Sequence, residues 1–168
     1  MRKAFLIALG VVHLLLVDAV TKELAVGLLK GSAPVPVVPG FFDLAYVENV
    51  GCAWGMLQGC VWPLALFAVL ALAVIVWKRD ELFEAKGTGW RRKAGAWAEV
   101  LLYAGITGNL LDRVLRGHVI DFLDFHWADA YHFPCFNAAD VYITVAAGLL
   151  VLLALTAEKE KGAKGAAQ

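Results

Sequence analysis

Four aspartates close together in this sequence have the side chains best suited to acid–base chemistry. Asp121, Asp124, Asp129 and Asp140 precede an apolar run that starts at Val141. Two carboxylates held together in a partly dry setting do not both ionise readily, so such a pair shares one proton over an intermediate pH range. That state suits the activation of water for peptide hydrolysis, and it equally suits the binding of a proton or cation in a transporter.

Asp121 and Asp140 are the two aspartates that neighbouring elements can bring together. Asp121 follows one apolar segment, and Asp140 begins the next. If these segments form antiparallel helices, their outer ends meet and the two carboxylates can face each other at the membrane surface. Asp124 and Asp129 lie between them in an aromatic-rich loop, where we expect solvated side chains.

Two further polar residues lie inside an apolar segment, where each costs about 2.5–3.5 kcal/mol on insertion and marks a candidate functional site. Asp18 and Lys22 are spaced as i and i+4, so on a helix they share one face and can pair. An ion pair that anchors the end of the helix and a catalytic role both remain open.

Asn109, Asp112 and Arg113 share one face of another segment, and Gly105 and Gly108 allow close helix packing there. An interhelical polar clamp is one interpretation. The depth of Arg113 favours support of a substrate or an active site, since an Arg one turn later could extend freely to the membrane surface.

Two asparagines complete the set of candidate residues. Asn49 and Gly51 belong to a segment, 49–55, whose glycines permit tight turns. Asn49 can cap a strand-to-helix turn, or it can present its amide for hydrogen bonding in a site. Asn137 lies beside Asp140 at the start of the last apolar segment.

Long apolar segments must position these groups. The 168 residues are 61% hydrophobic and only 18% charged, whereas a soluble domain has about 25% charged residues. Four segments, at about 4–29, 61–77, 94–113 and 138–156, approach the roughly 17–25 residues that a membrane-spanning helix needs. We therefore expect an all-α membrane protein with four transmembrane helices in a single domain, 1–168. A cleaved secretory signal is the alternative for the first segment, but Asp18 lies where its apolar run should end.

The basic residues predict the orientation of these helices. Eleven of the 15 Lys and Arg residues lie on one side: Arg2, Lys3, Lys78, Arg79, Lys86, Arg91, Arg92, Lys93, Lys159, Lys161 and Lys164. We expect both termini and the loop 78–93 to be cytoplasmic, with the other two loops outside. The formal net charge is zero, so no nucleic-acid partner is indicated.

The two outer segments are expected to differ in structure. A β region at about 38–58 contains alternating apolar and polar residues, which predict a small extracytoplasmic sheet. The segment at about 114–137 is expected to be an extracytoplasmic loop. Cys52 and Cys60 can form a disulfide if the exterior is oxidising, although the odd number of cysteines leaves this open. No recognised zinc-ligand spacing is present, so no metal is expected.

Five sequence patterns, in order along the chain, together resemble the bacterial lipoprotein signal peptidases, the signal peptidase II family. They are DAVTK (18–22), NVGCAWG (49–55), GITGNLLDR (105–113), VIDF (119–122) and FNAAD (136–140). Each pattern is weak alone, but five in register are specific, and they extend over nearly the whole chain.

The resemblance implies an intramembrane aspartyl endopeptidase of the bacterial cytoplasmic membrane. Such an enzyme removes the signal peptide from diacylglyceryl-modified prolipoproteins, on the N-terminal side of the lipidated Cys. The resemblance assigns Asp121 and Asp140 as the catalytic pair, and assigns substrate binding or support to Asp18, Lys22, Asn49, Gly51, Asn109, Arg113 and Asn137. The sheet would form a cradle and the second outer segment a lid. Membrane lipid and the inhibitor globomycin are implied partners, and no metal or organic cofactor is expected.

A small proton- or cation-coupled transporter that uses Asp18, Asp121 and Asp140 is the alternative function, and a structural membrane subunit is a third. Against the transporter, the polar residues gather near one face of the membrane instead of lining a full path.

Overall fold

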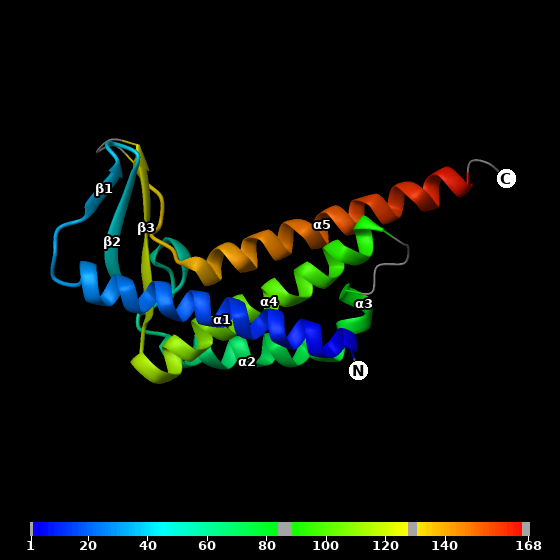
Figure 1. The fold of residues 1–168 in the computed structure, drawn as a ribbon, viewed down its shortest axis with the longest axis horizontal. Coiled ribbons are helices and arrows are strands. Elements are labelled where there is room, and N and C mark those ends of the chain that lie inside the picture. Colours follow the sequence, from blue (N-terminus) through cyan, green and yellow to red (C-terminus); the bar gives the residue numbers. More distant parts are fainter. Residues whose placement is uncertain (1, 84–88, 128–130, 166–168) are drawn as a thin grey trace.

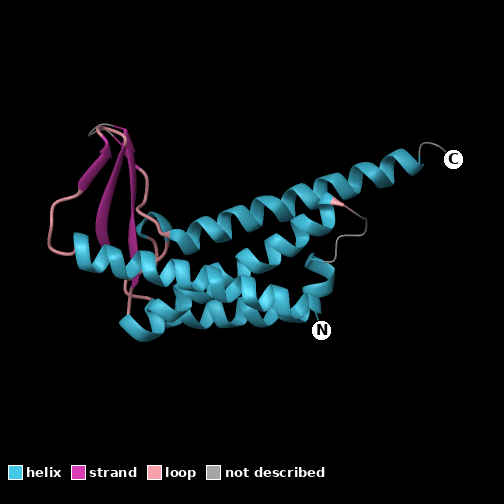
Figure 2. Ribbon diagram, in the orientation of Figure 1, coloured by secondary structure: helices cyan, strands magenta, loops and turns pink. Residues whose placement is uncertain are grey.

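The fold consists of long helices and a small antiparallel sheet. The computed structural model describes residues 2–83, 89–127 and 131–165. The helices are α1 (Arg2–Leu29), α2 (Val61–Trp77), α3 (Arg79–Phe83), α4 (Trp90–Arg116) and α5 (Ala138–Gly165), with a short 3-10 turn, η1 (Ala53–Gly55). The strands are β1 (Val35–Val38), β2 (Phe42–Asn49), β3 (Val119–Trp127) and β4 (Tyr131–His132). The sheet stands at one end of the helices, opposite the start of α1 (Figure 1, Figure 2).

α4 is the central helix, because it packs against α1, α2 and α5. Gly10 of α1 lies against Val100 of α4, and further along the two helices a Cβ on Gly108 would lie 2.6 Å from Asp18 Oδ2. α1 and α4 therefore run parallel, with their first turns at the same end of the molecule (Figure 1). The close packing predicted for Gly108 is confirmed.

The sheet packs on the C-terminal end of α1. Its strands pair antiparallel in the order β1-β2-β3-β4. At the start of β3, Ile120 and Phe122 form a buried apolar cluster with Ala25 and Leu29 of α1. Side chains alternate between the faces of a strand, so Asp121 points away from this cluster.

The prediction of a loop over 114–137 is wrong for most of that segment. α4 continues to Arg116, and β3 and β4 follow it. The sheet takes its third strand, β3, from this segment. Its first strand also begins at Val35, three residues before the predicted β region 38–58. Asp124 lies on β3 with a half-buried side chain, not on a solvated loop, and Asp129 lies outside the described residues. The expected loop 78–93 likewise contains α3 and the start of α4.

Two helices in the described part of the chain are long and apolar enough to cross a membrane, Arg2–Leu29 and Ala138–Ala157. The first begins two residues before the segment 4–29, and α2 coincides with the segment 61–77. α2 is apolar but has only 17 residues. α4 extends beyond the segment 94–113 and carries charged residues near both ends. All four expected segments are helical, and in the described part of the chain two of these helices, α1 and α5, are long and apolar enough to cross a membrane.

Candidate active site

Asp121 is buried at the start of β3, beside the end of β2. The register of the two strands pairs Asp121 with Val47 and Val119 with Asn49. Asn49 Nδ2 donates a hydrogen bond to Asp121 Oδ2 at 2.8 Å, while Asn49 Oδ1 accepts one from the Gly51 N–H at 2.9 Å. The Asn49 amide therefore performs both functions considered from the sequence, since it closes the turn after β2 and it holds Asp121.

Asp140 is held in the first turn of α5. Its Oδ2 accepts a hydrogen bond from the Asn137 N–H at 3.1 Å, and its own N–H donates to Asn137 Oδ1 at 3.1 Å. In this reciprocal capping box, the residue before the helix and the residue three positions later satisfy each other's N–H groups. Asp140 Oδ1 accepts a further hydrogen bond from Asn109 Nδ2 of α4 at 2.7 Å. Both oxygens of the Asp140 carboxylate are therefore fixed.

Asn137 connects the two carboxylates. It has no exposed surface, and its Nδ2 donates to Asp121 Oδ1 at 2.7 Å and to Asn109 Oδ1 at 3.1 Å. Its backbone N–H donates to Asp140, as described above. One buried asparagine thus determines the relative positions of Asp121 and Asp140.

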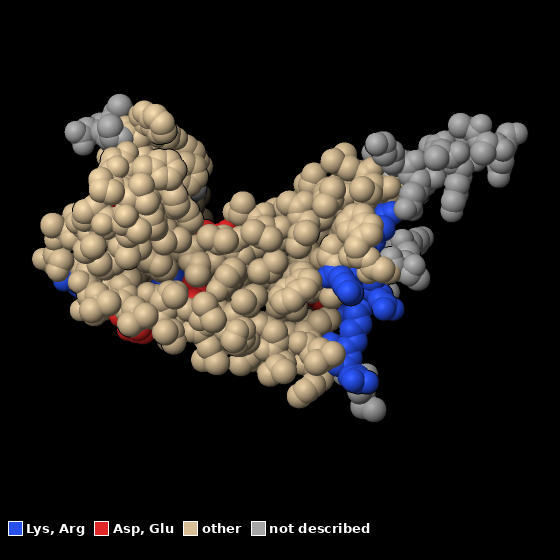
Figure 3. All heavy atoms as spheres, turned by 45° about the horizontal axis from the view of Figure 1, so that its top comes forward, with Lys and Arg blue, Asp and Glu red and all other residues tan. Residues whose placement is uncertain are grey.

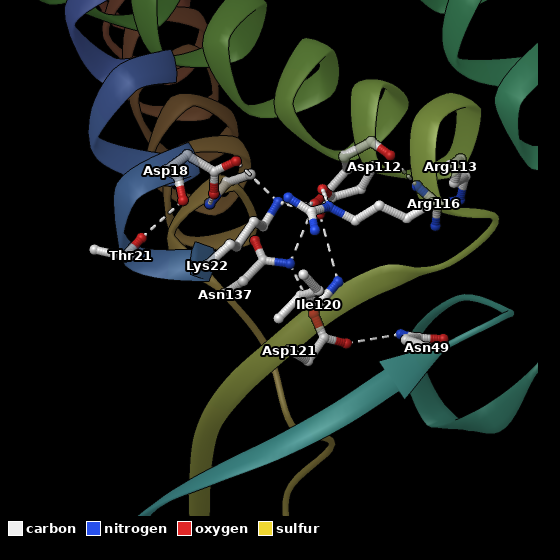
Figure 4. A network of polar contacts seen from close by, with 12 residues as sticks. Asp18, Thr21, Lys22, Asn49, Asp112, Arg113, Arg116, Ile120, Asp121 and Asn137 are labelled. Atoms are coloured by element: carbon white, nitrogen blue, oxygen red, sulfur yellow. Dashed lines mark hydrogen bonds and ion pairs between the residues drawn. The ribbon is translucent and has the colours of Figure 1, made fainter. Parts of the chain in front are cut away.

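Lys22 lies behind the two carboxylates and is only 1% exposed. Its Nζ lies 2.8 Å from Asp18 Oδ2 and 2.9 Å from Asp112 Oδ2, and Figure 4 draws these three residues. The same nitrogen lies 3.1 Å from Asn109 Oδ1. These three acceptors satisfy the three donors of an ammonium group. The ion pair of Asp18 with Lys22 that the spacing predicts is confirmed. Asp18 Oδ1 also accepts a hydrogen bond from the Ala139 N–H at 3.0 Å, so α1 helps to cap α5.

The orientation of the Asn109 amide follows from these neighbours. An ammonium group only donates hydrogen bonds, so the Asn109 oxygen must face Lys22. The amide NH₂ group of Asn109 then faces Asp140 Oδ1. A buried cation on α1 thereby determines which atom α4 presents to Asp140.

Arg113 joins α4 to the turn after β2. Its Nη2 donates a hydrogen bond to the Gly51 carbonyl oxygen at 3.0 Å, and its Nη1 donates to the Asn109 carbonyl oxygen at 3.2 Å. Gly51 is required at this turn, because a Cβ there would lie 2.5 Å from the Met56 carbonyl oxygen. Arg113 and Gly51 therefore fix the loop beside Asn49.

Asp112 belongs to this network, although the family resemblance assigns it no role in the site. Besides pairing with Lys22, it accepts hydrogen bonds from Arg116 Nε at 3.0 Å and from the Ile120 N–H at 3.4 Å. Asp112 thus links α1 and α4 to the residue that precedes Asp121 (Figure 4). Its spacing from Asn109 and Arg113 was the available signal.

A cavity of about 520 Å³ lies in front of the two carboxylates. The candidate residues that line it are Asn49, Asn109, Arg113, Asp121 and Asp140. Its walls are mostly apolar and include Phe133, Phe136, Val141, Ile143 and Val145. Asp18, Lys22, Gly51 and Asn137 are not among the lining residues, so the candidates divide into a layer that faces the cavity and a layer that supports it.

Two aromatic side chains that the sequence left without a role also line this cavity. Trp54 of η1 and Phe133 contact each other edge to face, with 5.5 Å between their ring centroids. Trp54 comes from the connection between β2 and α2, and Phe133 comes from the connection between β4 and α5, so an aromatic contact joins these two segments at the cavity. Asp124 is not among the lining residues, and its carboxylate instead lies 3.4 Å from His132 Nδ1.

The protonation of Asp121 is sensitive to pH near neutrality. Burial raises the pKa of the Asp121 carboxyl to about 7, the charge of Asp140 raises it as well, and the hydrogen bonds from Asn49 and Asn137 oppose these effects.

Burial likewise raises the pKa of the Cys135 thiol, which also lines the cavity, to about 12. A thiol with that pKa stays protonated at neutral pH and is a poor nucleophile. Cys52 and Cys60, whose pairing the sequence leaves open, are free thiols as well.

The arrangement therefore places two carboxylates, Asp121 with a pKa near 7 and Asp140, on one cavity, beside an arginine and an apolar wall. These features suit acid–base hydrolysis of a substrate with an apolar portion.

Comparison with known proteins gives concordant matches. The family model described as signal peptidase (SPase) II matches residues 10–156. The lipoprotein signal peptidase of Symbiobacterium thermophilum is 39% identical over 144 residues, covering 86% of this chain and 90% of the relative. The lipoprotein signal peptidase of Ectopseudomonas mendocina is 38% identical over 167 residues, covering 94% of this chain and 90% of the relative.

Solved structures agree with these relatives. A bacterial membrane enzyme determined by the in meso method at 2.3 Å resolution is similar to this chain with a TM-score of 0.77 and 30% identity. The similarity covers 92% of this chain and 90% of that one. A second bacterial membrane enzyme, at 1.9 Å resolution, has a TM-score of 0.69 and 31% identity over 89% of this chain and 91% of that one.

Proposed function

Since this chain belongs to the signal peptidase II family, we propose that it is an aspartyl endopeptidase that removes signal peptides from diacylglyceryl-modified prolipoproteins. Cleavage occurs on the N-terminal side of the lipidated Cys. The observation that carries the proposal is the position of Asp121 and Asp140, which line one cavity and bind the same buried residue, Asn137.

In the proposed reaction, the two carboxyl groups hold one proton between them. The ionised group takes a proton from water as the water oxygen attacks the scissile carbonyl carbon. The protonated group donates a hydrogen bond, and then its proton, to the carbonyl oxygen, which gives a tetrahedral gem-diol. When the C–N bond breaks, the proton taken from water passes to the leaving nitrogen, and the gem-diol returns a proton to the other carboxylate. The pKa of Asp121 at about 7 supports this exchange at neutral pH.

The remaining cavity residues suit a lipidated peptide. Arg113 donates to two backbone carbonyl oxygens and has further N–H groups for the carbonyl oxygens of a substrate. The apolar wall is suited to the acyl chains of the diacylglyceryl group. Asn49 donates a hydrogen bond to Asp121 and Asn109 donates one to Asp140, so both carboxylates are already oriented when a peptide binds.

We place the protein in the bacterial cytoplasmic membrane, with α1, α2, α4 and α5 as four spanning helices and both termini in the cytoplasm. The distribution of Lys and Arg supports this orientation. The candidate site then lies near the extracytoplasmic face, with the sheet as a cradle and the segment that contains Phe133 as part of a lid. The transporter alternative gains no specific support, since each buried carboxylate on the helices already has a cationic partner. Asp18 and Asp112 pair with Lys22, and Glu99 pairs with Arg79.

The proposal is tested with the purified protein and a diacylglyceryl-modified prolipoprotein, with cleavage followed by gel shift in the presence and absence of globomycin. Asp121→Asn and Asp140→Asn are each expected to lower the cleavage rate by at least about 10²–10⁴-fold. Asp124→Asn is the matched control, because Asp124 lies on the same strand as Asp121 and outside the cavity lining. Cleavage at the wild-type rate by either of the first two variants would overturn the proposal.

A further inference from the structure

A second cavity lies between α1 and α4, at the end of the molecule away from the candidate active site. Its volume is about 480 Å³, and it occupies the first turns of both helices. The uncharged residues that line it are Leu6, Ile7 and Gly10 of α1 and Ala96, Trp97 and Val100 of α4. The cavity is therefore an apolar groove, and its floor lies where Gly10 approaches Val100.

Three cationic residues complete the lining of this groove. Arg2 and Lys3 come from the first turn of α1, and Lys93 comes from the first turn of α4. No acidic residue is among the lining residues in the part of the chain that the structure describes. On the face drawn in Figure 3, Lys and Arg gather at this end of the molecule, while uncharged side chains cover most of the helices.

We propose that this groove is a binding site for one anionic glycerophospholipid. Its phosphate lies among Arg2, Lys3 and Lys93, and an acyl chain lies along the apolar groove. Basic pockets between transmembrane helices on the cytoplasmic side are suited to anionic lipid head groups. A zwitterionic choline lipid would bring its own cation toward the three basic side chains, so the net charge of the head group decides the preference.

The apolar wall distinguishes a lipid from a soluble anion. A free phosphate would contact the cations but would leave the groove beside Leu6 and Ala96 unfilled. Trp97 is exposed at 60%, and an indole ring at that position is typical of the boundary between head groups and acyl chains. The lipid assignment depends on the groove and its cations. It does not depend on the peptidase reaction, and only its location in the cytoplasmic leaflet depends on the proposed orientation.

The experiment measures lipid binding to the full-length protein purified in a neutral detergent. Dioleoyl phosphatidylglycerol and dioleoyl phosphatidylcholine are added in turn, and bound lipids are counted by native mass spectrometry. We expect one phosphatidylglycerol to bind with clear preference over phosphatidylcholine. The double variant Arg2→Gln, Lys93→Gln is expected to bind phosphatidylglycerol about 25-fold more weakly, because each cation near an anionic lipid contributes roughly a factor of five.

Two further variants separate this site from general charge effects and from misfolding. Arg92→Gln is the matched control, since Arg92 neighbours Lys93 on α4, is exposed and is not among the lining residues. It is expected to bind phosphatidylglycerol as the wild type does. Ala96→Leu keeps every charge and fills the groove from a half-buried position, so it is expected to weaken binding.

Glycerol 3-phosphate supplies the head-group chemistry without the acyl chains. It is expected not to displace phosphatidylglycerol at millimolar concentration, and displacement would indicate a simple anion site and overturn the proposal. Equal binding of the two lipids, equal weakening by Arg92→Gln, or unchanged binding by Ala96→Leu would also overturn it. Each variant is compared with the wild type in prolipoprotein cleavage, so loss of lipid binding with normal cleavage keeps the two proposals distinct.

Discussion

Asn137 and Asp140 bind each other through two reciprocal hydrogen bonds at the start of α5. The Asn137 N–H donates to Asp140 Oδ2, and the Asp140 N–H donates to Asn137 Oδ1, both at 3.1 Å. The side-chain NH₂ group of Asn137 remains available, and it donates to Asp121 at 2.7 Å. Asn137, which caps α5, therefore also aligns the two candidate catalytic carboxyls.

Replacing Asn137 should affect stability and cleavage separately. Asn137→Ala removes the cap of α5, which costs about 0.5–2 kcal/mol in the free energy of unfolding, and also removes the link to Asp121. Asn137→Ser keeps an oxygen that can cap the helix but lacks the amide NH₂ group. We expect Ser to restore the thermal midpoint, measured in detergent, without restoring the cleavage rate. Full recovery of cleavage with Ser would show that the amide link is dispensable.

Cleavage should depend on pH near neutrality. Because the pKa of Asp121 is about 7, the proton shared by the pair is lost above that pH, and kcat/KM should fall on the alkaline side. The hydrogen bond from Asn137 lowers the pKa of Asp121, so Asn137→Ala should move this alkaline limb to higher pH. The measurement is initial rate at low substrate concentration from pH 5 to pH 9. A flat profile in the wild type would contradict the proposed proton exchange.

The stability of the protein should also decrease as pH rises toward neutrality. Burial raises the pKa of Asp121 from 3.8 to about 7, so in this window the folded protein holds a proton that the unfolded chain has released. The contribution is fully present below pH 4 and is lost as pH rises through 7, at up to about 1.4 kcal/mol per pH unit. Asp121→Asn resembles the protonated carboxyl and should remove this slope. Thermal midpoints of the wild type and of Asp121→Asn, measured from pH 4 to pH 9, test this prediction. Parallel curves for the two proteins would count against it.

Removing the buried cation should be far more damaging than removing an exposed one. Lys22→Met removes the buried cation that Asp18 and Asp112 share and leaves their other partners in place, and loss of such a cation costs about 3–5 kcal/mol in the free energy of unfolding. Lys30→Met is the matched control, since Lys30 pairs with Glu48 at 2.8 Å but both side chains are exposed. We expect little change in the control. Denaturant unfolding in detergent compares the two, and similar losses would refute the distinction.

Two glycine substitutions test the close approach of α1 and α4. A Cβ on Gly108 would lie 2.6 Å from Asp18 Oδ2, so Gly108→Ala should displace Asp18 and lower both stability and cleavage. Gly148, within α5, has no atom within 4 Å of an added Cβ. Gly148→Ala should therefore stabilise the helix by roughly 0.5–1 kcal/mol and leave cleavage unchanged. Thermal midpoints and cleavage rates are measured together, and a neutral Gly108→Ala would show that the helices can separate at no cost.

Local patterns in the sequence were sufficient to predict the contacts within and between helices. The spacing of Asp18 and Lys22 fixes their pairing, because residues four apart lie on one helix face. Gly105 and Gly108 indicated close packing in the same way, and a Cβ on Gly105 would lie 2.6 Å from the Ala139 carbonyl oxygen. These predictions needed only the helical period and the size of a side chain.

The third strand of the sheet could not be predicted in this way. β3 forms because β2, about 70 positions earlier in the chain, supplies its hydrogen-bonding partner, as the 72-residue separation of Asn49 and Asp121 illustrates. The role of Asp112 has the same origin, since Lys22 and Ile120 reach it from two other elements.

The sequence by itself thus determined the apolar helices, the acidic and amide groups near their ends, and the family that these groups resemble. Only the tertiary structure decided which groups face the cavity and which support it. The physical reason is that the orientation of a buried polar group depends on its hydrogen-bond partners. Lys22 orients Asn109, Asn137 joins Asp121 to Asp140, and each of these contacts exists only when α1, α4, α5 and β3 pack together.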